Sequence, residues 1–260
     1  MPEGDTLVRT AGGLRPFLLG RTVTAASART PGPRVEKVVG AEVTAVEAQG
    51  KNLLIRLSNG LELRTHLRMH GTWHRYRPGE RWRLPASRAR LVLEVEGSVA
   101  VCFDAPVVEL FEQRAEGLHP ALSRLGPDLL AAEPDIDEAL RRLRAPDRAH
   151  LDIAVALLDQ RALAGIGNEV KNEVLWQATV SPWARARDLD DAALRDLVGR
   201  AVAILREGAA TGRRPRHVYR RAARPCPRCG GIIGVTHQGS DLPRLTFWCP
   251  VCQPDPRIDP

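Results

Sequence analysis

Apolar residues near the start of the chain recur with the spacing of one helix face. They lie at Leu7, Ala11, Leu14 and Leu18, and intervals of three and four residues place them on a single side of a helix. Asp5 or Thr6 is positioned to cap this helix, and Gly20 is positioned to end it. The pattern predicts one amphipathic helix whose apolar side packs against the rest of its domain.

After this helix, apolar and polar residues alternate in short segments, as they do in strands with one buried face. The segments cover residues 52–57, 61–67, 91–95 and 98–103. Turn residues such as Ser58-Asn59-Gly60 and Glu96-Gly97 separate them. We therefore expect residues 1–115 to form an antiparallel β domain with a helix attached.

From about residue 120 the apolar period changes to that of helices. The segments that fit this period are 136–143, 153–160, 169–177 and 192–207. Residues 116–222 are thus predicted to form a helical domain. Residues 223–260 are rich in Cys, Pro and Gly, and they are too few to fold by apolar burial alone, so this third part needs a metal.

The formal net charge of +7 favours a polyanionic partner. Arginine supplies 35 of the 38 cations, a bias that a GC-rich genome also produces, so total charge leaves both explanations open. Seven arginines between Arg213 and Arg228 favour nucleic acid more directly. No apolar stretch approaches the roughly 20 residues that cross a bilayer, and the acidic start is unlike a secretion signal. We expect a cytoplasmic monomer without a membrane association.

Four of the five cysteines form two Cys-x-x-Cys pairs, Cys226 with Cys229 and Cys249 with Cys252, separated by 19 residues. Two such turns can present four thiolates tetrahedrally to one zinc ion. Strand-like residues between the pairs predict a β-hairpin, which either only ends the chain or also contacts DNA through Arg244. Because four thiolates leave no open coordination position, the zinc is expected to be structural. Cys102 is interpreted as a core residue.

A glycine-rich turn precedes Asn168 and joins two predicted helices, at Gly165-Ile166-Gly167. The unpaired N–H groups of a helix start, with a capping Asn168 side chain, form a site for a phosphate. Such a turn is also common as a simple connection between helices. The pattern by itself supports either interpretation.

The N-terminus carries a second candidate chemistry. Removal of Met1 would leave Pro2 with a secondary amine, whose pKa of about 8 makes it partly neutral and nucleophilic. Its attack on a sugar carbon would give an iminium ion, and Glu3 is placed to transfer protons. Lys51 stands out as one of three lysines, at the start of an apolar strand. Taken alone, these residues also fit a frayed terminus and a solvated lysine.

The combined motifs resemble the bacterial formamidopyrimidine-DNA glycosylase and endonuclease VIII family. Pro2-Glu3-Gly4-Asp5-Thr6 resembles the start of its endonuclease VIII branch, and Gly50-Lys51-Asn52 its catalytic-lysine hairpin. Residues 163–175 resemble its helix–two-turn–helix motif, and residues 226–253 its zinc finger. The resemblance implies an α+β multidomain fold: an N-terminal antiparallel β-sandwich (1–115), a helix–two-turn–helix domain (116–222) and a C-terminal zinc-finger β-hairpin (223–260).

The resemblance also implies a bifunctional DNA glycosylase and AP lyase of base-excision repair. Pro2 would be the Schiff-base nucleophile, Glu3 the acid and base, and Lys51 a phosphate contact that helps to transfer protons. Asn168 and Arg244 would hold phosphates beside the flipped lesion in double-stranded DNA. A loop at Arg68-Met69-His70 would fill the gap left in the stack, although these residues depart from those usual in the family.

Two questions stay open at the level of sequence. A nucleic-acid-binding zinc protein that kept the fold and lost the chemistry is the rival to an enzyme, and the presence of Pro2, Glu3 and Lys51 argues against it. Oxidised pyrimidines, oxidised purines and abasic sites are all possible substrates, and the acidic start favours pyrimidines. His66, His70 and His74 recur every four residues, but in a strand they lie too far apart to share a metal ion.

Overall fold

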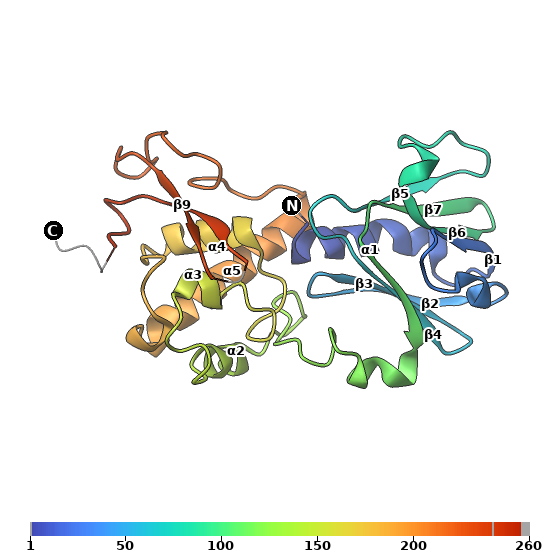
Figure 1. Cartoon of the computed structure of the whole chain (residues 1–260), viewed down its shortest axis with the longest axis horizontal. Helices are drawn as coiled ribbons and strands as arrows, with labels where there is room; N and C mark the ends of the chain where they lie inside the picture. The colour runs from blue at the N-terminus through green and yellow to red at the C-terminus, as the bar shows by residue number, and fades with distance from the viewer. Residues whose placement is uncertain (1, 241, 256–260) are drawn as a thin grey trace. The chain divides into compact units, whose positions relative to one another are not determined.

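The computed structural model describes residues 2–240 and 242–255 and contains two units, Met1–Arg124 and Leu125–Pro260 (Figure 1). In the first unit, two four-stranded antiparallel sheets and one helix surround a common core. In the second, helices carry a two-stranded hairpin. The predicted α+β fold, with a β-sandwich, a helical part and a four-cysteine hairpin, is confirmed. The three-part division at residues 115/116 and 222/223 stays a prediction.

The strands of the first unit form two sheets with different strand orders. One sheet has the order β1 (Val23–Ala28), β6 (Ala89–Val95), β7 (Ser98–Phe103) and β5 (Thr72–Tyr76). The other has the order β2 (Val43–Gln49), β3 (Asn52–Leu57), β4 (Leu61–His66) and β8 (Val107–Glu112). Short 3₁₀ turns lie between strands, at Val35–Val38, Ala86–Arg88 and Gln113–Leu118.

The four strands predicted from alternation correspond to β3, β4, β6 and β7, so these predictions are confirmed. Strands β1, β2, β5 and β8 were missed. Small or polar residues blur their alternation, as in the Val-Thr-Ala-Ala-Ser-Ala sequence of β1 and the Thr-Trp-His-Arg-Tyr sequence of β5. Their place in the sheets is set by pairing with strands distant in sequence, which local alternation does not encode.

Helix α1 (Gly4–Leu18) covers the core between the sheets with the predicted apolar side. Leu7, Ala11, Leu14 and Leu18 are all buried there with residues of both sheets. The capping prediction was wrong, because Glu3 and not Asp5 or Thr6 is the N-cap. Thr6 instead accepts a hydrogen bond from the backbone N–H of Glu3 at 3.4 Å through its hydroxyl. The helix therefore begins two or three residues earlier than expected, directly after Pro2 and Glu3.

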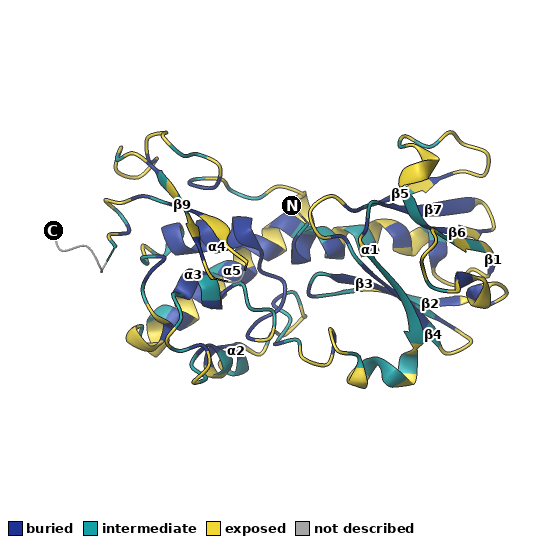
Figure 2. Cartoon of the chain, viewed as in Figure 1, coloured by how far each residue is buried: buried dark blue, intermediate teal, exposed yellow. Residues whose placement is uncertain are grey.

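Strand β7 is buried along its whole length, because both faces of its sheet are covered (Figure 2). One face belongs to the main core, which includes Cys102. On the other face, Tyr76, Val101 and Phe103 form a small cluster that Trp82 and Leu84 cover. Cys102 is fully buried, and this burial raises the pKa of its thiol well above the ordinary range. The structure thus places Cys102 in the core, as interpreted from the sequence.

The second unit contains four α-helices within its described residues: α2 (Ile136–Leu143), α3 (Ile153–Ala156), α4 (Asn168–Gln177) and α5 (Asp191–Thr211). A 3₁₀ turn at Ala186–Asp188 precedes α5, and the hairpin consists of β9 (Gly234–Gln238) and β10 (Arg244–Trp248). Their apolar faces form one helical core, and a smaller cluster lies beneath the hairpin. Helices α2, α4 and α5 agree with the prediction within a few residues.

Helix α3 ends at Ala156, four residues before the predicted end. In the segment after Ala156, polar side chains form hydrogen bonds with the backbone of that same segment, and these replace the hydrogen bonds of a longer helix. Asp159 accepts from the N–H of Arg161, and Gln160 donates to the carbonyls of Leu158 and Ile166. Gln160 also accepts from Gly165 N–H at 3.1 Å. The turn before α4 is therefore braced by its own side chains.

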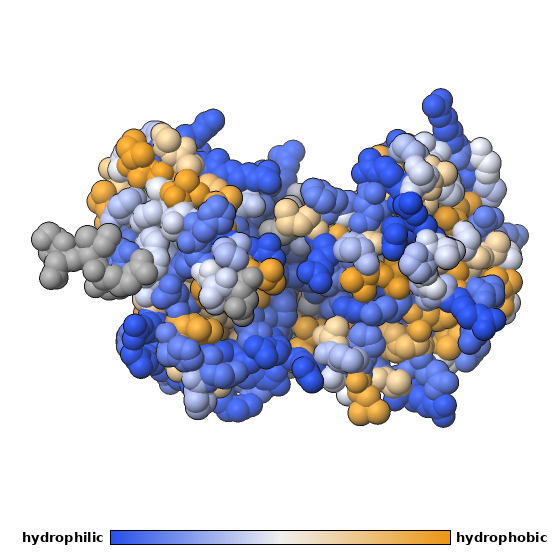
Figure 3. Space-filling view, in the orientation of Figure 1, coloured by the Kyte–Doolittle hydropathy of each residue, from blue (hydrophilic) through white to orange (hydrophobic). Residues whose placement is uncertain are grey.

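The outer surfaces of both units are largely polar. Figure 3 shows hydrophilic residues across much of the visible face of each unit. In residues 2–240 and 242–255, no helix combines the length and apolar character needed to span a membrane.

Candidate functional site

Pro2, Glu3 and Lys51 lie at the same end of the first unit. Gly20 N–H donates to the Val43 carbonyl at 2.8 Å, and the Arg15 guanidinium donates to the Val46 carbonyl at 2.8 Å. Helix α1 therefore runs antiparallel to β2. The start of the helix at Gly4 lies about 16 Å along the helix axis from Arg15. Lys51 lies about the same distance along the strand direction from Val46, on the same side. Figure 1 shows both ends on one side of this unit.

The start of α1 gives Pro2 and Glu3 a distinct environment. Glu3 is fully buried although it is a glutamate, and Pro2 is half-buried. Removal of Met1 would give Pro2 a free amine, and the positive end of the helix dipole would disfavour the protonated form of that amine. The buried Glu3 carboxyl would then lie next to it in the chain, in a position to transfer protons.

Lys51 lies in the two-residue turn between β2 and β3. Gly50 occupies the first turn position with φ of +56°, a conformation that glycine adopts without strain. Asn52 follows, and its buried amide donates to the Gln49 carbonyl at 3.0 Å and accepts from Arg64 at 2.9 Å. These bonds fix the turn, so Lys51 projects from a rigid hairpin.

The same end of this unit carries concentrated positive charge. Burial first, and then the nearby charges of Arg64, Arg68 and Lys51, lower the pKa of His66 to about 4. Its Nδ1 accepts from the backbone N–H of Arg68 at 3.1 Å, so the neutral ring carries its proton on Nε2. At neutral pH His66 adds no charge. Arg64 is paired with the Glu109 carboxylate, so Arg68 and Lys51 are the cations near His66 that would favour an anion at this end of the unit.

The predicted gap-filling residues form an exposed loop after β4. Arg68, Met69 and His70 are all exposed, and Met69 keeps 51% of its surface. Arg68 has φ of +51°, and Gly71 N–H donates to the Leu67 carbonyl at 2.9 Å, which closes the loop tightly. A Cβ at Gly71 would lie 2.6 Å from that carbonyl oxygen, so the closure requires glycine. The loop presents one apolar and two basic side chains to solvent.

In the second unit the start of α4 and the start of β10 are joined by hydrogen bonds. Asn168 donates through Nδ2 to the Leu245 carbonyl at 2.9 Å, which places it beside Arg244. Asn168 is not the capping residue, because Gly167 is the N-cap and Asn168 is the first residue of the helix. Its Oδ1 is buried and has no hydrogen-bond partner among the described residues. Arg244 is exposed. The two predicted phosphate contacts are thus brought together.

Two further residues of α4 fasten the hairpin. Lys171, almost fully buried, donates to the Thr246 hydroxyl at 2.9 Å. Asn172 accepts from the Phe247 N–H at 2.8 Å through Oδ1. Sequence reasoning did not assign a role to Lys171. Lys171 is one of only three lysines in the chain, and this scarcity of lysine could have pointed to a specific role for it. The prediction used the same argument for Lys51 alone.

The four cysteines of the two Cys-x-x-Cys pairs converge. All four Sγ atoms lie within 4.8 Å of one another. The Sγ–Sγ distances of 3.4 Å between Cys229 and Cys249 and 4.0 Å between Cys226 and Cys252 are close to the edge of about 3.8 Å that a tetrahedron of sulfur ligands has around zinc. N–H groups of Arg228 and Trp176 outweigh burial and hold the pKa of the Cys226 thiol at about 6, whereas burial and the neighbouring thiols raise the pKa of Cys249 and that of Cys252, the latter to about 12. The convergence of four Sγ atoms is therefore the observation that fits a metal ion that prefers thiolates. Within the described part of the chain, no other His, Cys, Asp or Glu group forms such a cluster, so the three histidines do not share an ion.

Acidic residues of α4 anchor the arginine-rich segment that precedes the first cysteine. Glu173 accepts from the backbone N–H groups of His217, Val218 and Tyr219 at 2.8–3.0 Å. Glu169 pairs with Arg216 at 2.8 Å. Part of the cluster between Arg213 and Arg228 therefore holds the hairpin to the helix, and its charge is not all available to a polyanion.

Comparison with known proteins shows that the chain is similar to DNA glycosylases of one group. Residues 1–106 match the model of the formamidopyrimidine-DNA glycosylase N-terminal domain, and residues 125–218 match that of the formamidopyrimidine-DNA glycosylase H2TH domain. A probable endonuclease 8 2 of Streptomyces coelicolor is 40% identical, with 100% of this chain and 96% of the relative covered. The DNA-(apurinic or apyrimidinic site) lyase Nei2 of Mycolicibacterium smegmatis is 37% identical, covering 97% and 99%.

The fold is also that of a solved structure. The Fpg protein of Lactococcus lactis, in a complex with DNA that contains N7-benzyl-Fapy-dG, aligns with a TM-score of 0.84. The two chains are 22% identical, and the match covers 98% of this chain and 100% of the other. At this identity the match concerns the fold.

Proposed function

The chain belongs to the formamidopyrimidine-DNA glycosylase and endonuclease VIII family, and from this premise we propose that it is a bifunctional DNA glycosylase and AP lyase of base-excision repair. The observation that carries the proposal is the position of Pro2 and the buried Glu3 at the start of α1, at the same end of the unit as Lys51. The name of the 37% identical Nei2 lyase supports the same activity.

After removal of Met1, the neutral amine of Pro2 attacks C1′ of the damaged nucleotide. The proton released by the amine passes to the departing base as the C1′–N bond to the base breaks. Glu3 then protonates O4′, the C1′–O4′ bond of the sugar ring opens, and a C1′ iminium ion forms. This cation withdraws electrons, so a base removes the C2′ proton and the C3′–O bond breaks with loss of the 3′ phosphate. A second elimination releases the 5′ phosphate. Water then hydrolyses the iminium and restores the amine.

Lys51 and the cations around His66 hold the phosphates of the reacting strand in this proposal. Asn168 and Arg244 hold the phosphates that flank the lesion. Asn168 lies at the start of helix α4, where backbone N–H groups favour an anion, and Arg244 binds through the paired N–H groups of its guanidinium. Cys226, Cys229, Cys249 and Cys252 would hold a zinc ion, which would fix the geometry of the hairpin that carries Arg244. Four thiolate ligands would leave the ion no open coordination position for substrate, so its role would be structural.

The substrate is double-stranded DNA that contains an oxidised base, mainly a pyrimidine, or an abasic site. The Pro2-Glu3-Gly4-Asp5-Thr6 start supports the pyrimidine branch. Fold neighbours were solved with DNA that contains an oxidised pyrimidine or an abasic site. The exposed Arg68, Met69 and His70 are the side chains that fill the space left by the flipped nucleotide.

A Glu3→Gln variant tests whether the chain is an enzyme or only a binding protein. The amide keeps the size of Glu3 but cannot transfer a proton, so base excision should fall by about 10²–10⁴-fold. DNA affinity should remain within about threefold. Single-turnover excision on duplexes with an oxidised pyrimidine measures the first quantity, and anisotropy titration measures the second.

Glu94→Gln is the matched control, because Glu94 is an exposed glutamate near the end of β6. It should excise like the wild-type protein. An unchanged excision rate in Glu3→Gln would refute the role of Glu3. If the wild-type protein neither excises oxidised pyrimidines or purines nor cleaves the strand at abasic sites, the binding protein is favoured.

A further inference from the structure

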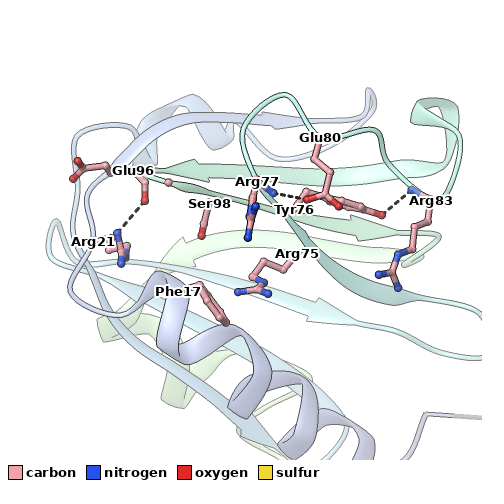
Figure 4. Close-up of a pocket in the computed structure, with 10 residues that line it drawn as sticks. Phe17, Arg21, Arg75, Tyr76, Arg77, Glu80, Arg83, Glu96 and Ser98 are labelled. Carbon is pink, nitrogen blue, oxygen red and sulfur yellow. Dashed lines mark hydrogen bonds between the residues drawn. The ribbon is translucent and has the colours of Figure 1, made fainter.

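A cavity of about 450 Å³ lies in the first unit at the far end of α1 from Pro2. Its wall includes Phe17 in the last turn of the helix, whereas Gly4 begins the helix about 20 Å away. The cavity is therefore separate from the end of this unit that carries Glu3 and Lys51. Figure 4 shows the helix below it and the strands of the β1-β6-β7-β5 sheet around it.

Four arginines line this cavity: Arg21, Arg75, Arg77 and Arg83. Only two carboxylates, Glu80 and Glu96, line it with them. Within residues 2–240 and 242–255, no carboxylate lies within ion-pair distance of any of the four guanidinium groups. All four residues are exposed, so solvent screens part of the repulsion between their charges. An anion held between the guanidinium groups would offset the repulsion that remains.

The backbone explains why Arg75 enters the cavity. Strand residues two apart share a face, so Arg75 lies on the same face as Trp73, which is part of the main core. Where another apolar residue would continue this core, the Arg75 guanidinium stacks on the Phe17 ring, 3.5 Å from its centroid. The stack holds the planar group in place and leaves its N–H edges for an oxyanion.

Other polar groups of the wall are already fixed. Glu80 accepts from the backbone N–H of Arg77 at 2.9 Å, and Arg21 donates to the Glu96 carbonyl at 3.0 Å (Figure 4). The Tyr76 hydroxyl accepts from the Arg83 N–H at 3.0 Å. In the view of Figure 4 the Arg75 guanidinium lies between Arg77 and the Phe17 ring. The loop that carries Arg77 and Arg83 is thus tied to the strand that carries Arg75.

We propose that this cavity is a second, non-catalytic phosphate site. Guanidinium groups bind phosphate oxygens by paired hydrogen bonds, and the volume accommodates a phosphate or pyrophosphate group with room for attached atoms. The phosphate belongs either to the backbone of DNA away from the lesion or to a small phosphate ligand. Both sources use the same recognition chemistry.

The test compares the double variant Arg75→Gln/Arg77→Gln with Arg34→Gln/Arg114→Gln. The control removes two exposed arginines that do not line the cavity and whose ion pairs are at the surface. Inorganic pyrophosphate is titrated while arginine Nε–Hε resonances are followed by NMR. In parallel, the Kd for an undamaged 30-base-pair duplex is measured at several salt concentrations. The single variant Arg77→Gln, which does not disturb the Phe17 stack, repeats the test if the double variant unfolds.

A small phosphate ligand is indicated if the wild type and the control bind pyrophosphate and the cavity variant binds it at least tenfold more weakly, with equal salt dependence for DNA. A DNA phosphate is indicated if the salt slope of the cavity variant falls by about 1–2 more than that of the control. Either result supports the site. If the wild type does not bind pyrophosphate and both double variants have the same salt slope, or if the cavity variant binds both probes like the control, the proposal is wrong.

Discussion

The β-sandwich of the first unit and the cysteine hairpin of the second are stabilised in different ways. The sandwich buries apolar residues of two sheets and α1 in one continuous core. The hairpin has two strands of five residues and a small apolar cluster, and it depends on four cysteines and on polar side chains of α4. Two-stranded hairpins are marginal in water without such support.

Because of this difference, the proposed chemistry at Pro2 and the proposed DNA contact at Arg244 depend on separate stabilising interactions. The end of the sandwich that carries Pro2, Glu3 and Lys51 is built on a core that needs no metal. Arg244 instead stands on a strand whose position depends on the cysteines and on bonds such as Lys171 to Thr246. Loss of metal should therefore affect DNA binding by the hairpin and leave the fold around Pro2 intact.

Metal removal should have the largest effect. Chelation, or Cys249→Ser, removes a metal whose binding stabilises small zinc domains by about 10 kcal/mol or more, so the hairpin should unfold locally. Hydrogen exchange should accelerate by orders of magnitude in β9 and β10 and stay slow in β3, with Cys102→Ser as the cysteine control for metal content. Slow exchange in β9 and β10 after verified metal loss would contradict the inference that the hairpin depends on the metal and the sandwich does not.

Substitution of Arg244 should affect binding without this structural loss. Arg244→Ala is expected to weaken duplex binding by about 1–2 kcal/mol and to reduce the salt slope by about 1, because one phosphate contact is lost. Bound metal, measured by atomic emission, should not change. Arg195→Ala, which removes an exposed arginine of α5, is the matched control. Equal affinities of the two variants would mean that the hairpin does not contact DNA through Arg244.

The smallest effect concerns the charge balance at the lysine end of the sandwich. The pKa of His66 is about 4 in the folded protein and about 6.5 when unfolded, so the unfolded chain binds the extra proton between these values. The stability that neutral His66 provides is complete above pH 6.5 and decreases as pH falls towards 4. From pH 7 to pH 5.5 the loss should be about 1 kcal/mol.

Urea unfolding of His66→Gln and of the wild type, at both pH values, measures this contribution. The variant should lose less stability by about that amount, because glutamine does not titrate. Comparing the two proteins removes the contributions of other groups, including Glu62, whose pKa burial raises to about 7. Identical pH dependence in both proteins would show that His66 titrates normally.

The sequence predicted best those features that depend on local periodicity and spacing. The apolar face of α1, the strands β3, β4, β6 and β7, and the cysteine cluster all follow from short patterns. Prediction from the sequence failed where contacts with residues distant in the chain determine the environment of a side chain. Lys171 is buried only because β10 lies on α4, and Asn168 bonds to Leu245 and does not cap its own helix. Such contacts join residues more than seventy positions apart and leave no local signal.

The chemistry at Pro2 can be measured directly. Protein with verified loss of Met1 is incubated with DNA that contains an abasic site, borohydride is added, and the adduct is located by mass spectrometry. A reduced covalent link between the DNA sugar and the nitrogen of Pro2 is the expected result, because borohydride reduces an iminium ion to a stable amine. Strand cleavage with no adduct, or an adduct on Lys51, would contradict the central claim.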